Sequence, residues 1–213
     1  MKKSALLLFA LVTVFMFSGC EIYSIVKDIT DKEEGRITTT DGKILTGRVE
    51  MPNANTKKLT IVTADKQKTV LNCENIKELV VWKKTHTDIK HVLQYLPSHK
   101  LTNPKKVRKP LWMALLTSGP YLKIYGCSFN YSIPSNGVLK ITSVKGGDIM
   151  YFALKKGETV PYGIFNTGHS KRDAKERFQE YLSDDPVLCK KLKDAEINPL
   201  EYETIAQEYN PNR

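Results

Sequence analysis

A series of short alternating segments, separated by turn residues, constrains the fold of this 213-residue chain more than any other feature. Between residues 36 and 83, apolar and polar residues alternate with a period of two, which is the pattern of strands that bury one face. Asp41-Gly42 is a two-residue hairpin signal, and Gly47 lies inside the next apolar segment, where it indicates a bend or bulge. The pattern predicts five short strands, at 36–40, 43–51, 59–64, 69–72 and 76–83.

The same segment, from Asp41-Gly42 through "GRV" at 47–49 to "LTIVTADKQKTVLNCENIKEL", resembles SH3-like and Sm-like domains. The resemblance implies a small β-barrel over residues 35–84 that serves as a scaffold or docking module. Trp82 is its only aromatic residue, so it lacks the interleaved aromatic side chains that stack on nucleic-acid bases.

We interpret residues 85–110 as a connection between two modules. Apolar residues at i, i+3, i+4 and i+7 in "DIKHVLQYL", residues 88–96, predict a short amphipathic helix that Pro97 ends. The segment that follows has the proline content of a domain linker and the densest basic cluster of the chain. Four of its residues are candidates for contact with an anionic membrane or glycan, with a solvated linker as the alternative: Lys105, Lys106, Arg108 and Lys109.

Residues 111–166 contain further strand-like segments, and residues 170–210 have helical patterns. Alternating aromatic residues between Tyr121 and Phe152 either fill a β core or line a glycan-binding face. Three helix starts follow from their capping residues: Ser170 with Asp173, Asp185 before Pro186, and Asn198 before Pro199. The sequence therefore predicts an α+β fold, in which the small barrel precedes an antiparallel sheet module with C-terminal helices over residues 111–213.

The N-terminus has the order of a secretory signal peptide. Lys2 and Lys3 precede an apolar run over residues 5–17, and the small residues Ser18 and Gly19 follow. The run is shorter than the ~20 residues that a membrane-spanning helix needs. We therefore expect residues 1–19 to direct export and to be removed.

Met16-Phe17-Ser18-Gly19-Cys20 resembles the lipobox of bacterial lipoproteins, although Phe17 stands where Leu is usual. The resemblance implies cleavage between Gly19 and Cys20 and transfer of a diacylglyceryl group to the Cys20 thiol. Two or three acyl chains would hold the mature protein on a membrane, because each buried methylene contributes about 0.8 kcal/mol. Residues 20–34 would form a tether, and a single acidic residue beside the cysteine favours a periplasm-facing location. The alternatives are an ordinary signal peptide and an uncleaved N-terminal anchor.

The chain is basic, with 33 Lys and Arg against 23 Asp and Glu and a formal net charge of +10. Removal of residues 1–19 takes away two lysines and leaves about +8. Such a charge favours anionic partners, among them lipid headgroups and acidic glycans, with a well-solvated basic surface as the alternative. Export argues against nucleic acid as a partner. We expect a membrane contact through the acyl chains on Cys20, together with a protein partner or an anionic glycan or lipid partner.

No motif in the sequence indicates catalysis, a metal site or a cofactor. Cys73, Cys127 and Cys189 are too widely spaced for a zinc site or a C-x-x-C redox site, and they either form one disulfide or remain unpaired. The alternative is an envelope hydrolase that uses Cys127 as nucleophile and His169 as base.

The strand-rich halves, the segment "FQEYLSDDPVLCKKL" and "YN" near the C-terminus resemble uncharacterised two-part lipoproteins of Bacteroidetes-type bacteria. That resemblance implies no activity. We therefore expect a membrane-anchored, non-catalytic binding or structural module for a protein or an envelope component.

Overall fold

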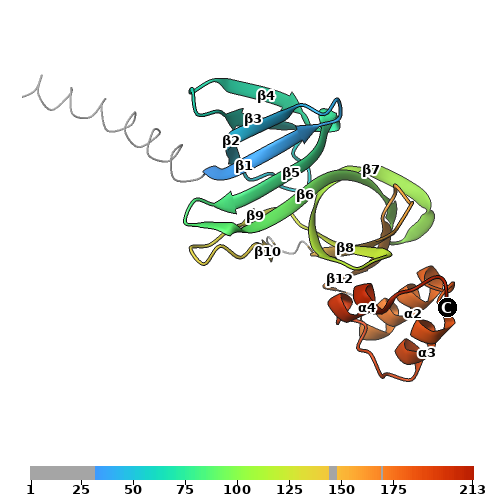
Figure 1. Ribbon diagram of the computed structural model, residues 1–213. Helices are drawn as coiled ribbons and strands as arrows, with labels where there is room; N and C mark the ends of the chain where they lie inside the picture. Colours follow the sequence, from blue (N-terminus) through green and yellow to red (C-terminus); the bar gives the residue numbers. More distant parts are fainter. Residues whose placement is uncertain (1–31, 144–147, 169) are drawn as a thin grey trace, which may run out of the picture. The chain divides into compact units, whose positions relative to one another are not determined.

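The computed structural model describes residues 32–143, 148–168 and 170–213 (Figure 1). Glu33–Arg213 form one compact unit. The expected signal peptide, Cys20, residues 21–31 of the expected tether, and His169 lie outside the described residues. None of the described helices is long and apolar enough to cross a membrane.

Ten strands form one antiparallel sheet in the order β12-β11-β8-β7-β6-β5-β1-β2-β3-β4. The five strands expected in the first half are present: β1 (Lys32–Thr39), β2 (Ile44–Glu50), β3 (Lys58–Val62), β4 (Lys68–Asn72) and β5 (Ile76–Lys83). The second half contributes β8 (Leu122–Cys127), β11 (Met150–Lys155) and β12 (Tyr162–Asn166), and a separate two-stranded sheet pairs β9 (Asn130–Ser132) with β10 (Lys140–Thr142). The predicted α+β class, with an antiparallel sheet and C-terminal helices, is confirmed.

The expected helix over residues 88–96 is wrong, because this segment lies in strand β6 (His86–Lys100). Strand β6 pairs with β7 (Asn103–Ser118), so the segment interpreted as a linker forms a long hairpin instead. Apolar residues recur at helical intervals because both faces of β6 are covered: Leu93 lies in one core and Leu96 packs against another. Pro97 is tolerated because it lies at a register shift between Leu96 and Ser98, where the strand ladder is interrupted.

Strand β7 is also covered on both faces, which explains the continuous apolar run "LWMALL" at residues 111–116. Trp112 and Ala114 belong to the core of the first half, whereas Leu111 and Met113 belong to a core on the opposite face. All four residues are at most 6% exposed. The β6–β7 hairpin therefore lies between two cores and belongs to both.

The core of the first half lies between the strands around β1–β5 and the small β9–β10 sheet (Figure 1). Tyr131 and Ile133, from the segment that includes β9, are both at most 5% exposed and pack into this core. The strand order places β4 at one end of the sheet, and within the described residues no pairing joins β4 back to another strand of the first half. The expected SH3-like or Sm-like barrel is therefore not confirmed.

The second half of the sheet curves, so that the tip of the β6–β7 hairpin meets β12 (Figure 1). The His99 N–H donates a hydrogen bond of 2.9 Å to the Pro161 carbonyl, just before β12. The Arg177 guanidinium donates to the carbonyls of Gly163, at 3.2 Å, and of Leu101, at the hairpin tip. These contacts fix the hairpin tip against the end of the sheet.

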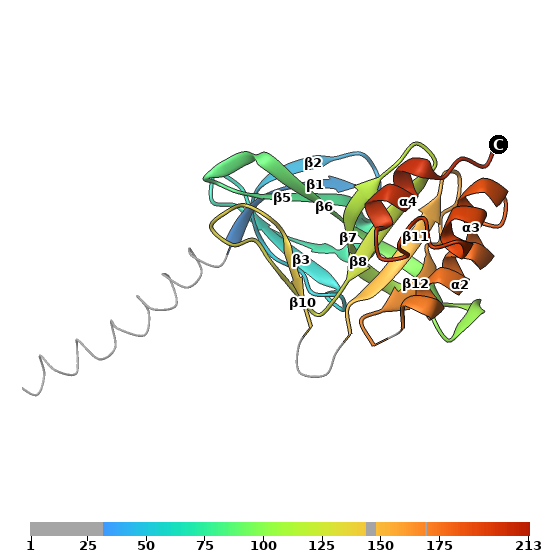
Figure 2. The ribbon, with the colours of Figure 1, turned by 90° about the horizontal axis from the view of Figure 1, so that it is seen from below.

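Three helices cover β8, β11 and β12 (Figure 2): α2 (Lys171–Tyr181), α3 (Pro186–Lys193) and α4 (Tyr202–Glu208). Their apolar residues join those of the strands in one core, in which Phe178, Leu188 and Ile205 are fully buried. The contact between α4 and the β7–β8 turn is close, because a Cβ atom at Gly119 would lie 1.7 Å from the Ala206 carbonyl oxygen.

Two of the three expected helix starts are confirmed. Ser170 and Asp173 form the predicted capping box of α2, and Asp185 caps α3 before Pro186. The third is wrong, because α4 begins after Glu201 rather than after Asn198. The Asn198 side chain instead accepts a hydrogen bond from the Leu200 N–H, which makes a local turn of the kind that competes with helix capping.

The buried Asp185 carboxylate joins α3 to the C-terminal segment. It is fully buried and accepts hydrogen bonds from the Leu188 N–H, the Asn210 N–H and the Arg213 guanidinium. Burial alone would raise the pKa of Asp185, but the hydrogen bonds from Arg213, Asn210 and Leu188 hold it below its ordinary value. The folded state therefore favours the ionised carboxylate.

We predict that Arg213→Ala lowers the free energy of unfolding by about 1–3 kcal/mol at pH 7, because it leaves the Asp185 carboxylate buried with fewer partners. The difference in the free energy of unfolding between Arg213→Ala and wild type is expected to reach its largest value above the ordinary pKa of an aspartate. It is expected to shrink as the pH falls through the lowered pKa of Asp185, since protonation removes the charge that Arg213 stabilises.

Urea unfolding at several pH values measures this difference. Arg172→Ala is the matched control, because Arg172 pairs with Glu176 only on the exposed surface of α2 and is expected to contribute less than about 0.5 kcal/mol. Equal losses in the two variants would contradict the role of Asp185.

Candidate functional site

The four basic residues singled out from the sequence lie on β7 and do not form one patch. Lys105 and Lys106 are consecutive strand residues and therefore point to opposite faces, and a register shift between Arg108 and Leu111 interrupts the alternation at Lys109. Arg108 is partly buried, and its Nη1 lies 3.3 Å from the Met150 sulfur. Of the four, Lys109 lines a concave site of the described surface.

This concave site, which we call the lysine depression, lies where the loop before β3, the end of β4 and the bend of the β6–β7 hairpin meet. Its volume is about 860 Å³. Most of its rim is polar or charged, and its apolar wall comes from the hairpin. The residues that line it are Asn55, Lys57, Lys58, Asn72, Glu74, Tyr95, Lys109, Pro110 and Leu111.

Trp112 fixes the loop that carries two of these residues, Asn55 and Lys57. The buried indole Nε1 donates a hydrogen bond of 3.0 Å to the Thr56 carbonyl, and the Trp112 N–H donates one of 3.0 Å to the Ala54 carbonyl. Within the loop, the side chain of Asn53 accepts a hydrogen bond of 2.9 Å from the Asn55 N–H. The loop is thus held from the core and from within, so the depression exists before any ligand binds.

Tyr95 contributes an aromatic ring to the wall of the depression. Its ring packs against Trp112 at a centroid distance of 5.6 Å and an interplanar angle of 45°. Burial raises the pKa of the Tyr95 hydroxyl, so this group is neutral and can donate a hydrogen bond at physiological pH. The wall therefore offers both an apolar ring and a polar hydroxyl.

The lysines of the depression have no charged partner within the described part of the chain. Lys57, Lys58 and Lys109 are exposed, and no described residue forms an ion pair or a side-chain hydrogen bond with them. Lys190 and Lys191 pair with Asp194 and Glu208, but other exposed lysines, such as Lys84, also lack a described partner, so what distinguishes these three is that they line one hollow. Three positive charges beside one carboxylate, that of Glu74, make the depression a place where an anion is favoured.

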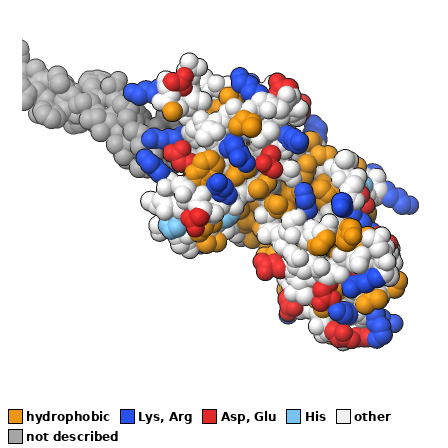
Figure 3. Space-filling view, in the orientation of Figure 1, with side chains coloured by type: hydrophobic (Ala, Val, Ile, Leu, Met, Phe, Trp, Pro, Cys, Tyr) orange, Lys and Arg blue, Asp and Glu red, His pale blue; other side chains and the backbone are white. Residues whose placement is uncertain are grey.

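Charge is also distributed unevenly along the chain. Residues 51–109, which contain β3–β6 and the start of β7, have thirteen Lys and Arg and four Asp and Glu. Residues 170–213, which contain the helices, have eight Lys and Arg and ten Asp and Glu. Basic side chains are scattered over the strands in Figure 3, and several acidic ones gather around the helices. The lysine depression lies in the basic part.

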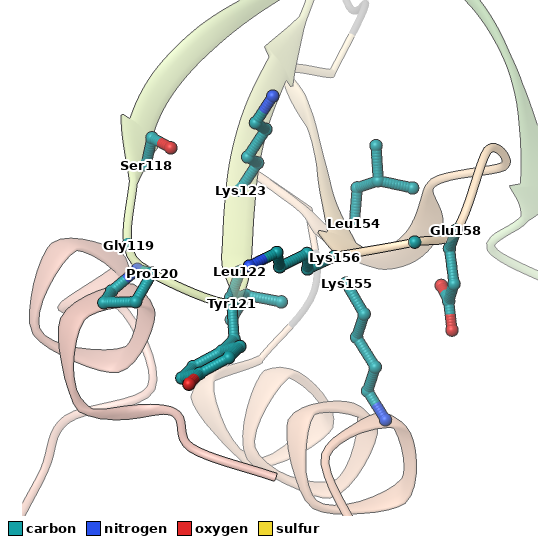
Figure 4. Close-up of a pocket in the computed structure, with 11 residues that line it drawn as sticks. Ser118, Gly119, Pro120, Tyr121, Leu122, Lys123, Leu154, Lys155, Lys156 and Glu158 are labelled. Atoms are coloured by element: carbon teal, nitrogen blue, oxygen red, sulfur yellow. The ribbon is translucent and has the colours of Figure 1, made fainter.

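A second hollow, of about 380 Å³, lies between the β7–β8 turn and the residues that follow β11. It contains Lys123, Lys155 and Lys156, but these side chains diverge, as Figure 4 shows. Lys155 points toward the helices, where its Nζ lies 2.9 Å from Asp184 and 4.9 Å from the centroid of the Tyr181 ring. Lys155 therefore connects the sheet to the helices, and we assign this hollow no binding role.

The cysteines give no support for catalysis. Cys73, Cys127 and Cys189 carry free thiols, so of the two alternatives the unpaired one is confirmed. Cys127 is fully buried, and burial raises the pKa of its thiol to about 11. Such a thiol is protonated at neutral pH and is a poor nucleophile. Its proposed partner, His169, lies outside the described residues.

Three aromatic residues of the second half fill the cores, and the described part of the chain shows no metal cluster. Tyr125, Tyr131 and Phe152 are at most 5% exposed and belong to the cores, which favours the core-filling alternative for them. Within the described ranges, no group of three or more His, Cys, Asp or Glu residues is placed to hold a metal ion.

The sequence alone did not reveal the lysine depression, because its residues come from segments far apart in the chain. Asn55 and Lys57 lie in a segment, "PNANTKK", that has only the composition of a loop. Tyr95 lies in the segment expected to be helical. The only local indication of an anion-binding site in the sequence is the pair of adjacent lysines at 57 and 58, close to the polar Asn55.

Comparisons with known proteins do not extend this description. No protein-family model matches the chain, and no curated protein and no solved structure is detectably similar to it. The function is therefore argued from the geometry and chemistry of the described residues.

We predict that Trp112→Phe loosens the loop before β3, because it removes the hydrogen bond to the Thr56 carbonyl and leaves that acceptor without its buried donor. The loss of stability is expected to be about 1–3 kcal/mol. Amide hydrogen exchange should show faster exchange at Asn55, Thr56 and Lys57, beyond the change seen in the buried strands.

Trp82→Phe is the control, because Trp82 lies outside the depression and its ring contacts the Lys90 ammonium at 5.7 Å. This variant is expected to leave exchange in the loop unchanged. If loop exchange in Trp112→Phe rises no more than exchange in the strands, Trp112 does not hold the loop.

Proposed function

We propose that this protein is a lipid-anchored protein of the bacterial envelope that acts as a non-catalytic binding module for an anionic envelope component. The observation that carries the proposal is the lysine depression, where three lysines without described ionic partners line a hollow whose loop is already fixed. A preformed site loses less conformational entropy on binding than a mobile one, which favours recognition.

The composition of the depression favours binding over hydrolysis. Glycoside hydrolysis ordinarily needs two carboxyl groups that flank the scissile bond. The residues that line the depression include one carboxylate, Glu74, together with lysine and asparagine side chains. These side chains suit the recognition of charge and hydroxyl groups, and they do not form a pair of acid and base.

The anchor is argued from the resemblance of residues 16–20 to a lipobox. In the proposal, cleavage between Gly19 and Cys20 leaves Cys20 as the acylated N-terminus of the mature protein. Acyl chains at Cys20 would then place the basic surface near other envelope components, with the periplasm as the favoured side.

We also propose that β1–β5 are related to small SH3-like barrels and serve as the scaffold of the depression. Two features support this. The strands pair with their neighbours in the order β5-β1-β2-β3-β4, and Gly47 lies where β2 meets the end of β3 at close range. A Cβ atom at Gly47 would lie 2.2 Å from the Val62 carbonyl oxygen, so the close approach of the two backbones requires glycine.

Metabolic labelling with an alkyne fatty acid tests the anchor. Wild type is expected to incorporate the label and to sediment with membranes, and Cys20→Ala is expected to lose both properties, because only the Cys20 thiol would accept the diacylglyceryl group. Cys189→Ala is the control and should retain the label. Label in Cys20→Ala, or none in wild type, would refute lipidation at Cys20.

Binding of a polyanion tests the module. Detergent-solubilised full-length protein is expected to bind dextran sulfate and to ignore neutral dextran. The apparent Kd for dextran sulfate should rise as NaCl increases, because salt screens the attraction between exposed charges. Microscale thermophoresis at low and physiological salt measures this. Equal binding of both polymers, or binding that salt does not weaken, would contradict recognition through charge.

A further inference from the structure

We infer that the lysine depression is a binding site for acidic glycans, and that it recognises carboxylated sugars of the hexuronate type. This inference rests on the proposed function and names the chemistry of the ligand. Its starting point is the combination of unpaired lysines, two asparagines, a carboxylate and an aromatic ring in one concave site.

The size of the depression suits a short stretch of sugar rings. Its volume of about 860 Å³ lies in the range of roughly 300–1,000 Å³ that is typical of small-molecule sites. The cavity is open to solvent along an exposed rim, because Lys57, Lys58 and Lys109 are all exposed. A chain can therefore enter from the side, with a few of its residues in the depression and the rest in solvent.

The distribution of charge favours carboxylates spread along a chain over one compact dianion. Lys58 begins β3 and Lys57 directly precedes it, whereas Lys109 lies on β7, so the three lysines reach the depression from two separate segments of the chain. No arginine lines the depression, although the planar fork of arginine is the usual choice for bidentate phosphate recognition. Glu74 would also repel a dianion more strongly than a monoanion.

The remaining polar groups match sugar hydroxyls. The amide groups of Asn55 and Asn72 can each donate and accept hydrogen bonds, and the Glu74 carboxylate can accept them. Both asparagine side chains are exposed, and no described residue occupies them with a side-chain hydrogen bond. A sugar hydroxyl can use both kinds of partner, because it donates a hydrogen bond to an acceptor such as the Glu74 carboxylate and accepts one from an asparagine amide.

Tyr95 would pack against the apolar face of a sugar ring. Its position is fixed by Trp112, whose ring lies 5.6 Å away and is itself fully buried. A rigid aromatic side chain offers contact area at little cost in conformational entropy. Because a sugar ring has an apolar face and a phospholipid headgroup does not, this contact favours a glycan.

The shape and surroundings of the depression also argue against a membrane as the ligand. The site is concave, and the consecutive residues Lys105 and Lys106 on β7 point to opposite faces of the strand, so a flat surface would meet only one of them. Among the described residues that are large, apolar and exposed, none lines the depression. The site therefore lacks the apolar side chains that would enter a bilayer.

The test compares three probes on the full-length protein in a non-ionic detergent: tetragalacturonate, its carboxyl-reduced neutral analogue, and mixed micelles of the same detergent with phosphatidylglycerol. Isothermal titration is expected to show binding of tetragalacturonate and at least tenfold weaker binding of the neutral analogue. The mixed micelles are expected not to compete with tetragalacturonate at equal concentration of negative charge.

Two triple variants of equal charge separate the depression from the basic surface as a whole. Lys57→Gln with Lys58→Gln and Lys109→Gln is expected to weaken tetragalacturonate binding at least tenfold. Lys84→Gln with Lys105→Gln and Lys106→Gln changes exposed lysines outside the depression, and is expected to weaken it less than twofold. Both variants alter exposed side chains, and circular dichroism confirms that they fold.

Tyr95→Ala tests the ring contact separately. It is expected to weaken tetragalacturonate binding about threefold to tenfold and to leave the salt dependence unchanged, because it removes no charge. Tyr95→Phe keeps the ring and should bind within about twofold of wild type. An unchanged Kd in Tyr95→Ala would refute the contact between Tyr95 and the sugar.

The outcomes distinguish this inference from the proposed function. Binding of dextran sulfate without binding of tetragalacturonate would overturn the inference and leave the binding module intact. Binding of neither polymer would overturn both. Equal losses in the two triple variants, or displacement of tetragalacturonate by the mixed micelles with phosphatidylglycerol, would show that the depression is not a site specific for acidic glycans.

Discussion

Burial of the β6–β7 hairpin on both faces is the constraint on which the rest of the structure depends. Leu93 and Trp112 lie in one core while Leu96 and Met113 belong to another, so the hairpin is shared by the two cores. The small β9–β10 sheet covers the first core, and the curvature of the second half encloses the other. Both arrangements remove apolar surface from water, which is the main driving force for folding.

The same hairpin also connects stability to the candidate site. Trp112 fills the core and at the same time donates to the carbonyls of Ala54 and Thr56, so the loop that carries Asn55 and Lys57 is fixed by a residue that the fold already requires. Tyr95, from the paired strand, lies beside Trp112 and forms part of the wall. The depression is therefore formed as a consequence of folding, and binding need not order its walls.

Charges in the structure have two different roles. Around the helices, Lys155 with Asp184 and Arg213 with Asp185 connect segments that are distant in the sequence, and these charges are held at close range by their partners. Around the depression, the lysines have no such described partner. Paired charges contribute to structure, whereas three lysines that line one hollow attract an anion, which is why we place the binding function in the first half.

Local signals determined much of the secondary structure from the sequence. Asp41-Gly42, the alternating strands, the capping box at Ser170 and the Asp185-Pro186 cap each depend on a few neighbouring residues, and each is present. The helix expected over residues 88–96 failed because apolar residues on both faces of a strand reproduce a helical interval, and the sequence does not say which faces will be covered. The lysine depression was also missed, because β3, β4 and β7 meet only after the strands pair. The sequence by itself thus determined most strands and caps, the net charge and the resemblance of residues 16–20 to a lipobox. Tertiary structure decided which surfaces are buried and which lysines converge, because both depend on contacts between residues far apart in the chain.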